Sequence, residues 1–182
     1  MQNVEIASQI FSVLTIIAEV AAVVLFFSLL FSNKITKKII KIFGQNATLL
    51  AFVVALAATL GSLFYSEIAG YTPCKLCWYQ RILMYPQVLL LGLAYLKKDR
   101  HITDYSMVLS FLGAGIALYH YLIQRGTIGE ILPCSAVGYS VSCAEKFVMT
   151  FGYITIPMMS LSAFLLIFFL MKVQKKYENS KR

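Results

Sequence analysis

Four cysteines fall into two pairs, and their spacing indicates thiol–disulfide chemistry. Cys74 and Cys77 are three residues apart, while Cys134 and Cys143 are separated by eight residues. The first pair stands where a loop is expected to become a helix. A cysteine at a helix N-terminus can have a lowered pKa, because free N–H groups and the helix dipole stabilise its thiolate. Since the thiolate is the reactive form, this pair is predicted to be redox-active.

The second pair flanks residues 135–142, which are rich in small and turn-forming types and predict a mobile loop. Two pairs allow electrons to be relayed, because a thiolate of one pair can attack the disulfide of the other. The residues alone leave two alternatives open, an inert structural disulfide and a zinc site. Zinc would require all four sulfurs in a tetrahedral arrangement, and nothing else in the sequence resembles a zinc motif, so no metal ligand is predicted.

Arg81 follows Cys77 by four residues and is therefore expected on the same helix face, slightly deeper in the membrane. An arginine at that depth is costly without a partner, which favours a functional role. We expect it to hold a polar head group. The alternative is that Arg81 extends back to the membrane interface, where Trp78 and Tyr79 would form part of an aromatic belt.

The composition indicates a membrane protein. Of the 182 residues 59% are hydrophobic and the mean hydropathy is +0.76, whereas roughly half of the residues of a soluble domain are apolar. The net charge of +8 comes from cations in short stretches between apolar runs, so nucleic-acid binding is not expected. Residues 1–9 hold no cation and include Glu5, which argues against a secretory signal peptide.

Five apolar segments are long enough to cross a bilayer, for which about 20 residues are needed. The predicted fold class is therefore all-α, an integral membrane helical bundle, since helices satisfy their own backbone polar groups in the hydrocarbon. Close approach of these helices is expected at Gly61, Gly92, Gly113 and Gly115. The five segments are residues 6–31, 47–68, 78–96, 105–123 and 151–173.

The distribution of lysine and arginine predicts how the chain is oriented. Twelve of the sixteen cations lie in residues 34–41, 97–100 and 172–182. Cytoplasmic segments hold the excess of such residues, so these three stretches and the C-terminus are expected in the cytoplasm. Both cysteine pairs and the N-terminus are then expected outside, where disulfides persist.

The segments around the cysteines closely resemble the bacterial disulfide bond formation family DsbB, especially its shorter BdbC branch. The resemblance runs from about residue 47 to residue 172. It is carried by residues 61–63, 66–68, 73–86 (PCKLCWYQRILMYP), 120–121 (HY), 133–134 (PC), Cys143 and 151–157 (FGYITIP).

This resemblance implies a four-helix core in the bacterial cell membrane that supports disulfide formation in exported proteins. The partners it implies are a soluble DsbA-like thiol oxidase of the thioredoxin fold, which is reoxidised, and the membrane quinone pool. The implied activity is that of a thiol:quinone oxidoreductase, and the implied cofactor is ubiquinone or menaquinone.

The resemblance also implies roles for individual residues. Cys134 would receive the partner's thiolate with Cys143 as its companion, and Cys74 with Cys77 would form the quinone-side pair. Cys77 would lie closest to the quinone ring. The remaining two site residues are Arg81, which would polarise the quinone as charge develops on it, and His120, at a family position near the head group. A packing role for His120 is the alternative.

The chain departs from the family in an additional N-terminal segment and in the spacing of its second cysteine pair. The additional segment determines the first of the expected domain boundaries. Residues 1–45 are interpreted as an additional transmembrane helix and a basic cytoplasmic loop, residues 46–173 as the four-helix core, and residues 174–182 as a basic cytoplasmic tail. Glu19, near the centre of the additional helix, is costly there and is interpreted as regulatory or as packing. The second cysteine pair is also spaced more widely than in the short branch. Pro86 and Pro157 are expected to bend helices.

Three other functions remain as hypotheses. An enzyme similar to the vitamin K epoxide reductase family has the loop pair before the quinone-side pair in the chain, which is the reverse of the order here. A membrane scaffold with two structural disulfides predicts that both pairs are buried, and it does not explain Arg81. A metal-handling protein ranks last.

Overall fold

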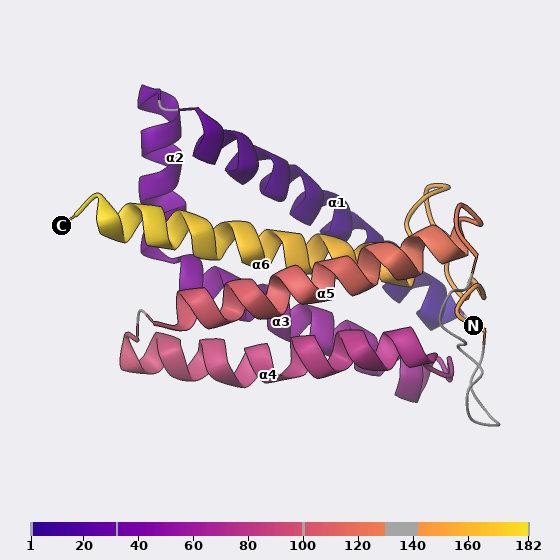
Figure 1. Cartoon of the computed structure of the whole chain (residues 1–182). Helices are drawn as coiled ribbons and strands as arrows, with labels where there is room; N and C mark the ends of the chain where they lie inside the picture. Colours follow the sequence, from indigo (N-terminus) through magenta and orange to yellow (C-terminus); the bar gives the residue numbers. More distant parts are fainter. Residues whose placement is uncertain (1, 32, 100, 130–141, 182) are drawn as a thin grey trace.

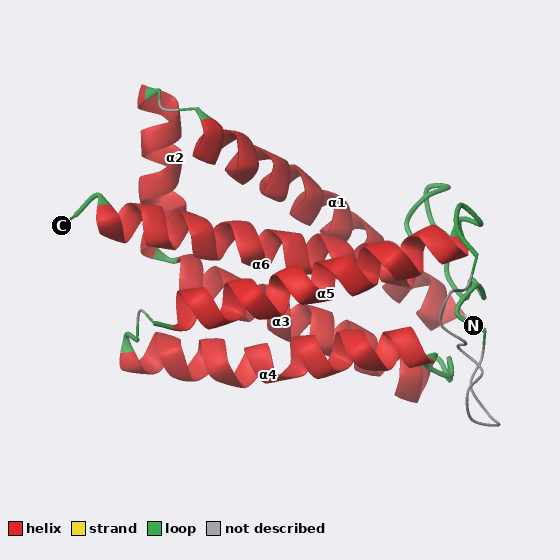
Figure 2. Ribbon diagram, in the orientation of Figure 1, coloured by secondary structure: helices red, strands yellow, loops and turns green. Residues whose placement is uncertain are grey.

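The computed structural model describes the chain apart from residues 1, 32, 100, 130–141 and 182, and apart from the side chains of residues 2 and 3. The described residues form helices and no β-strand (Figures 1 and 2), which confirms the predicted all-α membrane bundle. The elements are α1 (Gln2–Leu30), α2 (Lys34–Gln45), α3 (Ala47–Leu63), the π-helix η1 (Phe64–Ile68), α4 (Lys75–Lys97), α5 (Ile102–Gln124) and α6 (Ile156–Asn179).

Helix α6 is the central element of the bundle. It packs against α1, α2, α3 and α5, and Figure 1 shows it running between α1 and α5. Its sequence is apolar around most of its circumference, as expected for a helix surrounded by others. Phe164, Ile167, Met171 and Val173 on α6 are completely buried.

Among the residues that the structure describes, four helical stretches are long and apolar enough to cross a membrane: Val4–Leu30, Ala47–Ile68, Ile102–Gln124 and Ile156–Asn179. Helix α4 has 23 residues but a more polar composition, so its assignment as a fifth span stays a prediction. One of its polar residues, Gln87, is completely buried and accepts hydrogen bonds from Ser106 (2.8 Å) and Ser110 (3.0 Å) of α5. Such polar contacts join helices within an apolar surrounding.

The two ends of the bundle differ in what they carry. Figure 1 places the N-terminus, the start of α4, the end of α5 and the start of α6 at one end. The connection from α1 to α2, the connection from α4 to α5 and the C-terminus lie at the other end. The cysteines of the described residues therefore share one end, and the predicted cytoplasmic stretches share the other.

Residues 34–45 form a helix, α2, where a loop had been expected. Its lysines are exposed, whereas Ile40 and Gly44 are buried, and Gly44 packs against Tyr177 of α6. This alternation of charged and apolar residues at helical spacing is typical of an amphipathic helix at a membrane interface. The predicted loop rests on the lysines of this stretch and does not take into account the helical spacing of its apolar residues.

Helix α6 begins at Ile156, five residues later than predicted. Phe151 and Gly152 have positive φ angles of 51° and 76°, which interrupt a helix, and Thr155 is the N-cap. Pro157 then occupies the first turn, where its missing N–H has no helical partner to lose. The expectation that Pro157 bends a helix is therefore wrong, whereas Pro86 does lie inside α4.

Three of the four predicted glycines lie at close helix contacts. A Cβ atom on Gly61 would lie 3.3 Å from the Phe11 ring of α1, and one on Gly92 would lie 3.1 Å from Phe52 of α3. A Cβ atom on Gly113 would overlap the ring of Phe164. The prediction for Gly115 is wrong, because that position faces open space.

Replacing Gly113 by alanine is expected to destabilise the bundle by about 1–3 kcal/mol, because the buried Phe164 ring must move. Gly115→Ala is the matched control, and it should leave stability unchanged or raise it by up to about 1 kcal/mol through helix propensity. Thermal unfolding of both variants in one detergent measures the difference. Equal stability of the two variants would show that α5 and α6 do not depend on this contact.

Candidate functional site

The first cysteine pair lies at the N-terminus of α4, as predicted. Cys74 is the N-cap residue and Cys77 lies in the first turn, so their Sγ atoms are 3.2 Å apart. Neither sulfur is in a disulfide. Cys74 is buried and Cys77 is half-buried, which separates the two thiols into an inner and a more open position.

His120 on α5 is buried between the two cysteine segments. Its Nε2 atom lies 3.6 Å from the Cys74 Sγ and 3.2 Å from the carbonyl oxygen of Cys143, and its Nδ1 atom lies 3.0 Å from the Gln80 Nε2. A carbonyl oxygen only accepts hydrogen bonds, so Nε2 carries the proton. The Nδ1 lone pair then accepts from the Gln80 amide. Gln80 thus holds the ring in the form that offers an N–H to Cys74.

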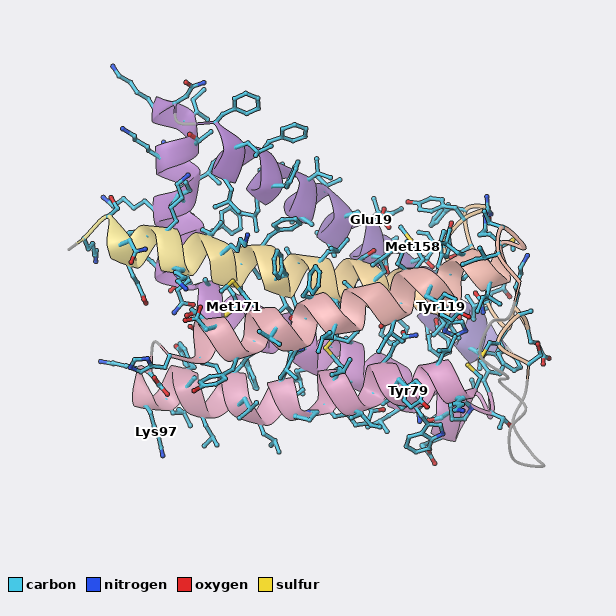
Figure 3. All side chains as sticks on the ribbon, viewed as in Figure 1. Glu19, Tyr79, Lys97, Tyr119, Met158 and Met171 are labelled. Atoms are coloured by element: carbon cyan, nitrogen blue, oxygen red, sulfur yellow. The ribbon has the colours of Figure 1, made fainter. Side chains whose placement is uncertain are left out.

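Cys143 lies at the same end of the bundle and is joined in a disulfide. It is buried in one cluster with Cys74, Leu76 and Ile123, and Tyr119 of α5, labelled in Figure 3, packs against this cluster. The two cysteine segments predicted to exchange electrons therefore meet. Cys134 lies outside the described residues, so its predicted role stays a prediction.

Aromatic stacking and one amide hold the segment after Cys143 in place. Tyr71, just before the first pair, stacks on Phe147 with ring centroids 4.8 Å apart and on Tyr65 at 5.9 Å. Gln124 at the end of α5 donates to the carbonyl of Glu145 at 2.8 Å. These contacts connect the loop of the second pair to the loop of the first.

Arg81 reaches across to α3. Its Nε donates to the Ser62 Oγ at 3.0 Å and its Nη2 to the Ser62 carbonyl at 3.1 Å. Tyr85 donates to the same Ser62 hydroxyl at 3.2 Å. The guanidinium also lies over the Trp78 ring, 5.2 Å from its centroid, an arrangement that stabilises a cation.

A cavity of about 340 Å³ opens beside these residues. Cys77, Arg81, Tyr85 and Ser62 line one part of it, and His120 also borders it. Most of the remaining lining is apolar and comes from α1, α3 and α6. Pockets that bind small organic ligands are typically of this size, largely apolar, with a few polar groups that fix orientation.

The structure brings Cys74, Cys77, Cys143 and His120 together, and it places Arg81 at the cavity one turn beyond Cys77. Sequence reasoning did not assign roles to Ser62 or Gln80. Ser62 is 19 residues from Arg81 on another helix, so no local spacing could have paired them. Gln80 was visible only as a polar residue in an apolar helix.

The donor atoms of Cys74, Cys77 and His120 lie within 4.8 Å of one another, a distance compatible with a bound metal ion. A metal would need the lone pair of Nε2, the histidine nitrogen that faces Cys74. That nitrogen instead carries a proton, because it also contacts the Cys143 carbonyl. This arrangement favours thiol chemistry over metal binding.

A bundle of apolar helices with two cysteine segments meeting at one end defines a membrane protein of thiol–disulfide exchange. The family described as disulfide bond formation protein DsbB matches residues 44–174. The chain belongs to this family, and its activity is that of an oxidoreductase in disulfide formation.

Individual relatives agree with this assignment. The chain is 46% identical to disulfide bond formation protein C of Bacillus subtilis over 127 residues, 69% of this chain and 89% of the relative. It is 46% identical over 138 residues to a probable disulfide formation protein of Oceanobacillus iheyensis, 76% of this chain and 91% of the relative. No solved structure matches the chain.

The environment of Cys74 lowers the pKa of its thiol far below the ordinary range. The main cause is the hydrogen bond that Cys77 gives to the Cys74 thiolate. Burial acts in the opposite direction, because it disfavours the charged form, and the hydrogen bond from His120 lowers the pKa further. The Cys74 thiolate is therefore present at a pH where an ordinary cysteine is protonated.

We predict that alkylation of reduced Cys74 depends little on pH between 8.5 and 6.5, whereas an ordinary thiol of pKa about 8.5 would lose roughly fiftyfold in rate. Because the pKa is lowered, reactivity is lost only as the pH falls through this lower value. The measurement is the rate of iodoacetamide modification at Cys74, followed by peptide mass spectrometry.

Two variants test the cause of this shift. Cys77→Ala removes the hydrogen-bond donor and should move the profile to higher pH, whereas Cys77→Ser keeps a hydroxyl donor and should move it less. Identical profiles for the two variants would contradict the assigned cause.

Proposed function

We propose that the protein is a thiol:quinone oxidoreductase that reoxidises a DsbA-like thioredoxin-fold partner. The observation that carries this proposal is the position of Cys77. It lies 3.2 Å from Cys74, which shares a buried cluster with Cys143, and it also lines an apolar cavity that contains Arg81. This arrangement supports a path for electrons from the loop, through Cys74 and Cys77, to the cavity.

The residues around the cavity fit a quinone. A quinone ring has two carbonyl oxygens, which need donors, and a prenyl tail, which needs apolar surface. The guanidinium of Arg81 and the hydroxyls of Ser62 and Tyr85 supply donors, and the rest of the lining is mostly apolar. These three residues, with Cys77, are the ones that would hold the ring.

The first half of the reaction oxidises the partner. By the family resemblance, a thiolate of the partner attacks the sulfur of Cys134 in a Cys134–Cys143 disulfide, and Cys143 leaves as a thiolate. The partner's second thiolate then attacks the mixed disulfide and releases Cys134. The partner gains its disulfide, and the loop pair holds two electrons more than before.

The second half moves these electrons inward. The Cys143 thiolate attacks Cys74 in a Cys74–Cys77 disulfide, and Cys77 leaves as a thiolate that faces the cavity. Cys134 next attacks the Cys143 sulfur, which restores the loop disulfide and releases Cys74. The described state, with Cys74 and Cys77 free and Cys143 in a disulfide, matches the end of this step.

The surroundings of Cys74 make it a good leaving group in that step. The Nε2–H of His120 and the Cys77 thiol both lie within reach of its sulfur, and a stabilised thiolate leaves more readily from a mixed disulfide. When bound, a quinone accepts two electrons and two protons and leaves as the quinol, and the Cys74–Cys77 disulfide is restored.

The relay is tested with the full chain in detergent, using a reduced thioredoxin-fold thiol oxidase as donor and decylubiquinone or menadione as acceptor. Cys77→Ser and Cys134→Ser are each expected to lower turnover by more than about a hundredfold, because each removes a thiol that one of the two half-reactions requires and the cycle cannot close. Lys97→Ala, at the opposite end of α4 (Figure 3), is the control and should retain activity. Absence of turnover in the unmodified protein with both quinones would rule out the proposal.

The role of Arg81 is measured in the same assay. Arg81→Met removes the guanidinium that would donate to a quinone carbonyl oxygen, and one charge-assisted bond of about 1.5–3 kcal/mol corresponds to roughly a tenfold to hundredfold loss of kcat/KM for the quinone. A single-turnover oxidation of the partner by the loop disulfide should be unaffected. A loss of that half-reaction as well would indicate a structural role for Arg81.

We further propose that the cysteine end of the bundle faces the cell exterior and the C-terminus the cytoplasm. The basic stretches gather at the end opposite the cysteines, as the excess of cytoplasmic cations predicts. In intact cells, a membrane-impermeant maleimide should label a cysteine introduced at Lys146 but not one introduced at Lys181. The reverse pattern of labelling would show the opposite orientation, in which Cys143 faces the cytoplasm and not the oxidising side.

A further inference from the structure

Helix α1 precedes the residues that match the family, which begin at 44, yet it is attached to the core by specific polar contacts. Ser8, Ser12, Thr15 and Glu19 recur every three or four residues and form one stripe along the helix. The first three are buried. Ser8 accepts a hydrogen bond from Tyr65 of η1 at 3.3 Å.

Glu19 continues this stripe into the middle of the bundle. Its carboxylate accepts a hydrogen bond from the Tyr153 hydroxyl at 3.0 Å and another from Ser162 of α6 at 3.1 Å. Figure 3 shows Glu19 where α1 approaches α6, near Met158. A carboxyl in an apolar surrounding is costly unless it has such partners. These bonds therefore fix which face of α1 is turned toward the core.

The neighbouring face of α1 lines the cavity described above. Four residues of α1 at the same helical spacing line the cavity of about 340 Å³ that Cys77 also lines: Phe11, Leu14, Ala18 and Ala21. Ala18 and Ala21 are only partly buried although they face inward. Space is left in front of their small side chains, on a helix whose exposed positions carry Val13, Val20 and other larger apolar residues.

We propose that α1 supplies the apolar wall of the quinone site, and that Leu14, Ala18 and Ala21 set the space for the ring and the first prenyl units. This inference rests on the proposed function and adds to it a part of the site outside the family match. Arg81 and Ser62 provide the polar side of the same cavity. The stripe through Glu19 holds the wall in register with them.

Substitutions that fill this space can distinguish two roles of α1, as a wall of the quinone site or as a helix that only packs against the core. A phenylalanine at Ala18 or Ala21 would occupy the cavity, so it should reduce quinone binding without loss of stability, because apolar volume is added where room exists. If α1 were merely structural, the same changes would leave binding unaltered. Val20→Phe, on the exposed side one or two residues away, is the matched control.

The chain contains a single tryptophan, Trp78, whose ring lies 5.2 Å from the guanidinium carbon of Arg81 at the cavity. Quinones quench tryptophan fluorescence, so titration with decylubiquinone measures binding directly. The titration is done on the full chain in detergent with Cys77→Ser, which prevents turnover. Ala18→Phe and Ala21→Phe should each raise the Kd by about tenfold or more, and Val20→Phe by less than about twofold.

A second readout does not depend on these substitutions. Residues 1–33 contain no lysine or arginine, so trypsin releases α1 in one fragment that ends at Lys34. A photoreactive azidoquinone should label this fragment as well as the fragments of α3 and α4, and excess decylubiquinone should prevent the labelling. This test holds even if a phenylalanine variant fails to fold.

The outcomes separate the two proposals. If the unmodified cavity binds quinone, but the Kd is unchanged in Ala18→Phe and Ala21→Phe and no label is found in residues 1–34, the role of α1 would be overturned. The proposed oxidoreductase function would then stand. No binding and no protected labelling anywhere would overturn the quinone site itself. The expected result is weaker quinone binding in Ala18→Phe and Ala21→Phe but not in Val20→Phe, together with a photolabel on α1 that excess decylubiquinone prevents.

Discussion

The contact of His120 with both cysteine segments is the interaction on which the rest of the site depends. Its Nε2 reaches the Cys74 sulfur and the Cys143 carbonyl, while Gln80 occupies the other ring nitrogen. All four groups are buried or nearly so, and a buried polar group without a partner is costly. The position of α4 against α5 and the position of the loop are therefore fixed by one histidine whose hydrogen bonds are satisfied together.

The same physical constraint explains the polar residues elsewhere in the bundle. A buried polar side chain in an apolar surrounding is costly without a hydrogen-bond partner, and several such side chains here have partners on other elements of the bundle. Arg81 donates a hydrogen bond to Ser62, and Gln87 accepts hydrogen bonds from two serines of α5. Glu19 accepts hydrogen bonds from Ser162 and Tyr153. Helix contacts are thus specified by a few hydrogen bonds as well as by packing, and one of these sets, Arg81 with Ser62, also lines the cavity.

The sequence predicts much of this arrangement, because the apolar runs and the spacing of the first cysteine pair are local signals. It places Cys74 and Cys77 at the start of α4 and Gly113 at a helix contact correctly. The pairing of Arg81 with Ser62 and of His120 with Gln80 depends on how separate helices pack, which a single sequence does not encode in any local spacing. The start of α6 was misplaced because the positive φ of Phe151, a non-glycine residue, follows from its surroundings rather than from its type.

The missing side chain at Gly113 has a consequence for the geometry of electron transfer. Phe164 of α6 fills the hollow that this glycine leaves in α5, so one helix cannot slide along the other by a turn without expelling the ring. His120 follows Gly113 by seven residues, about 10 Å along the helix axis. A wholly apolar contact in the middle of the bundle therefore sets the height of the imidazole relative to α6, and with it the level at which His120 meets the Cys143 segment that leads into α6.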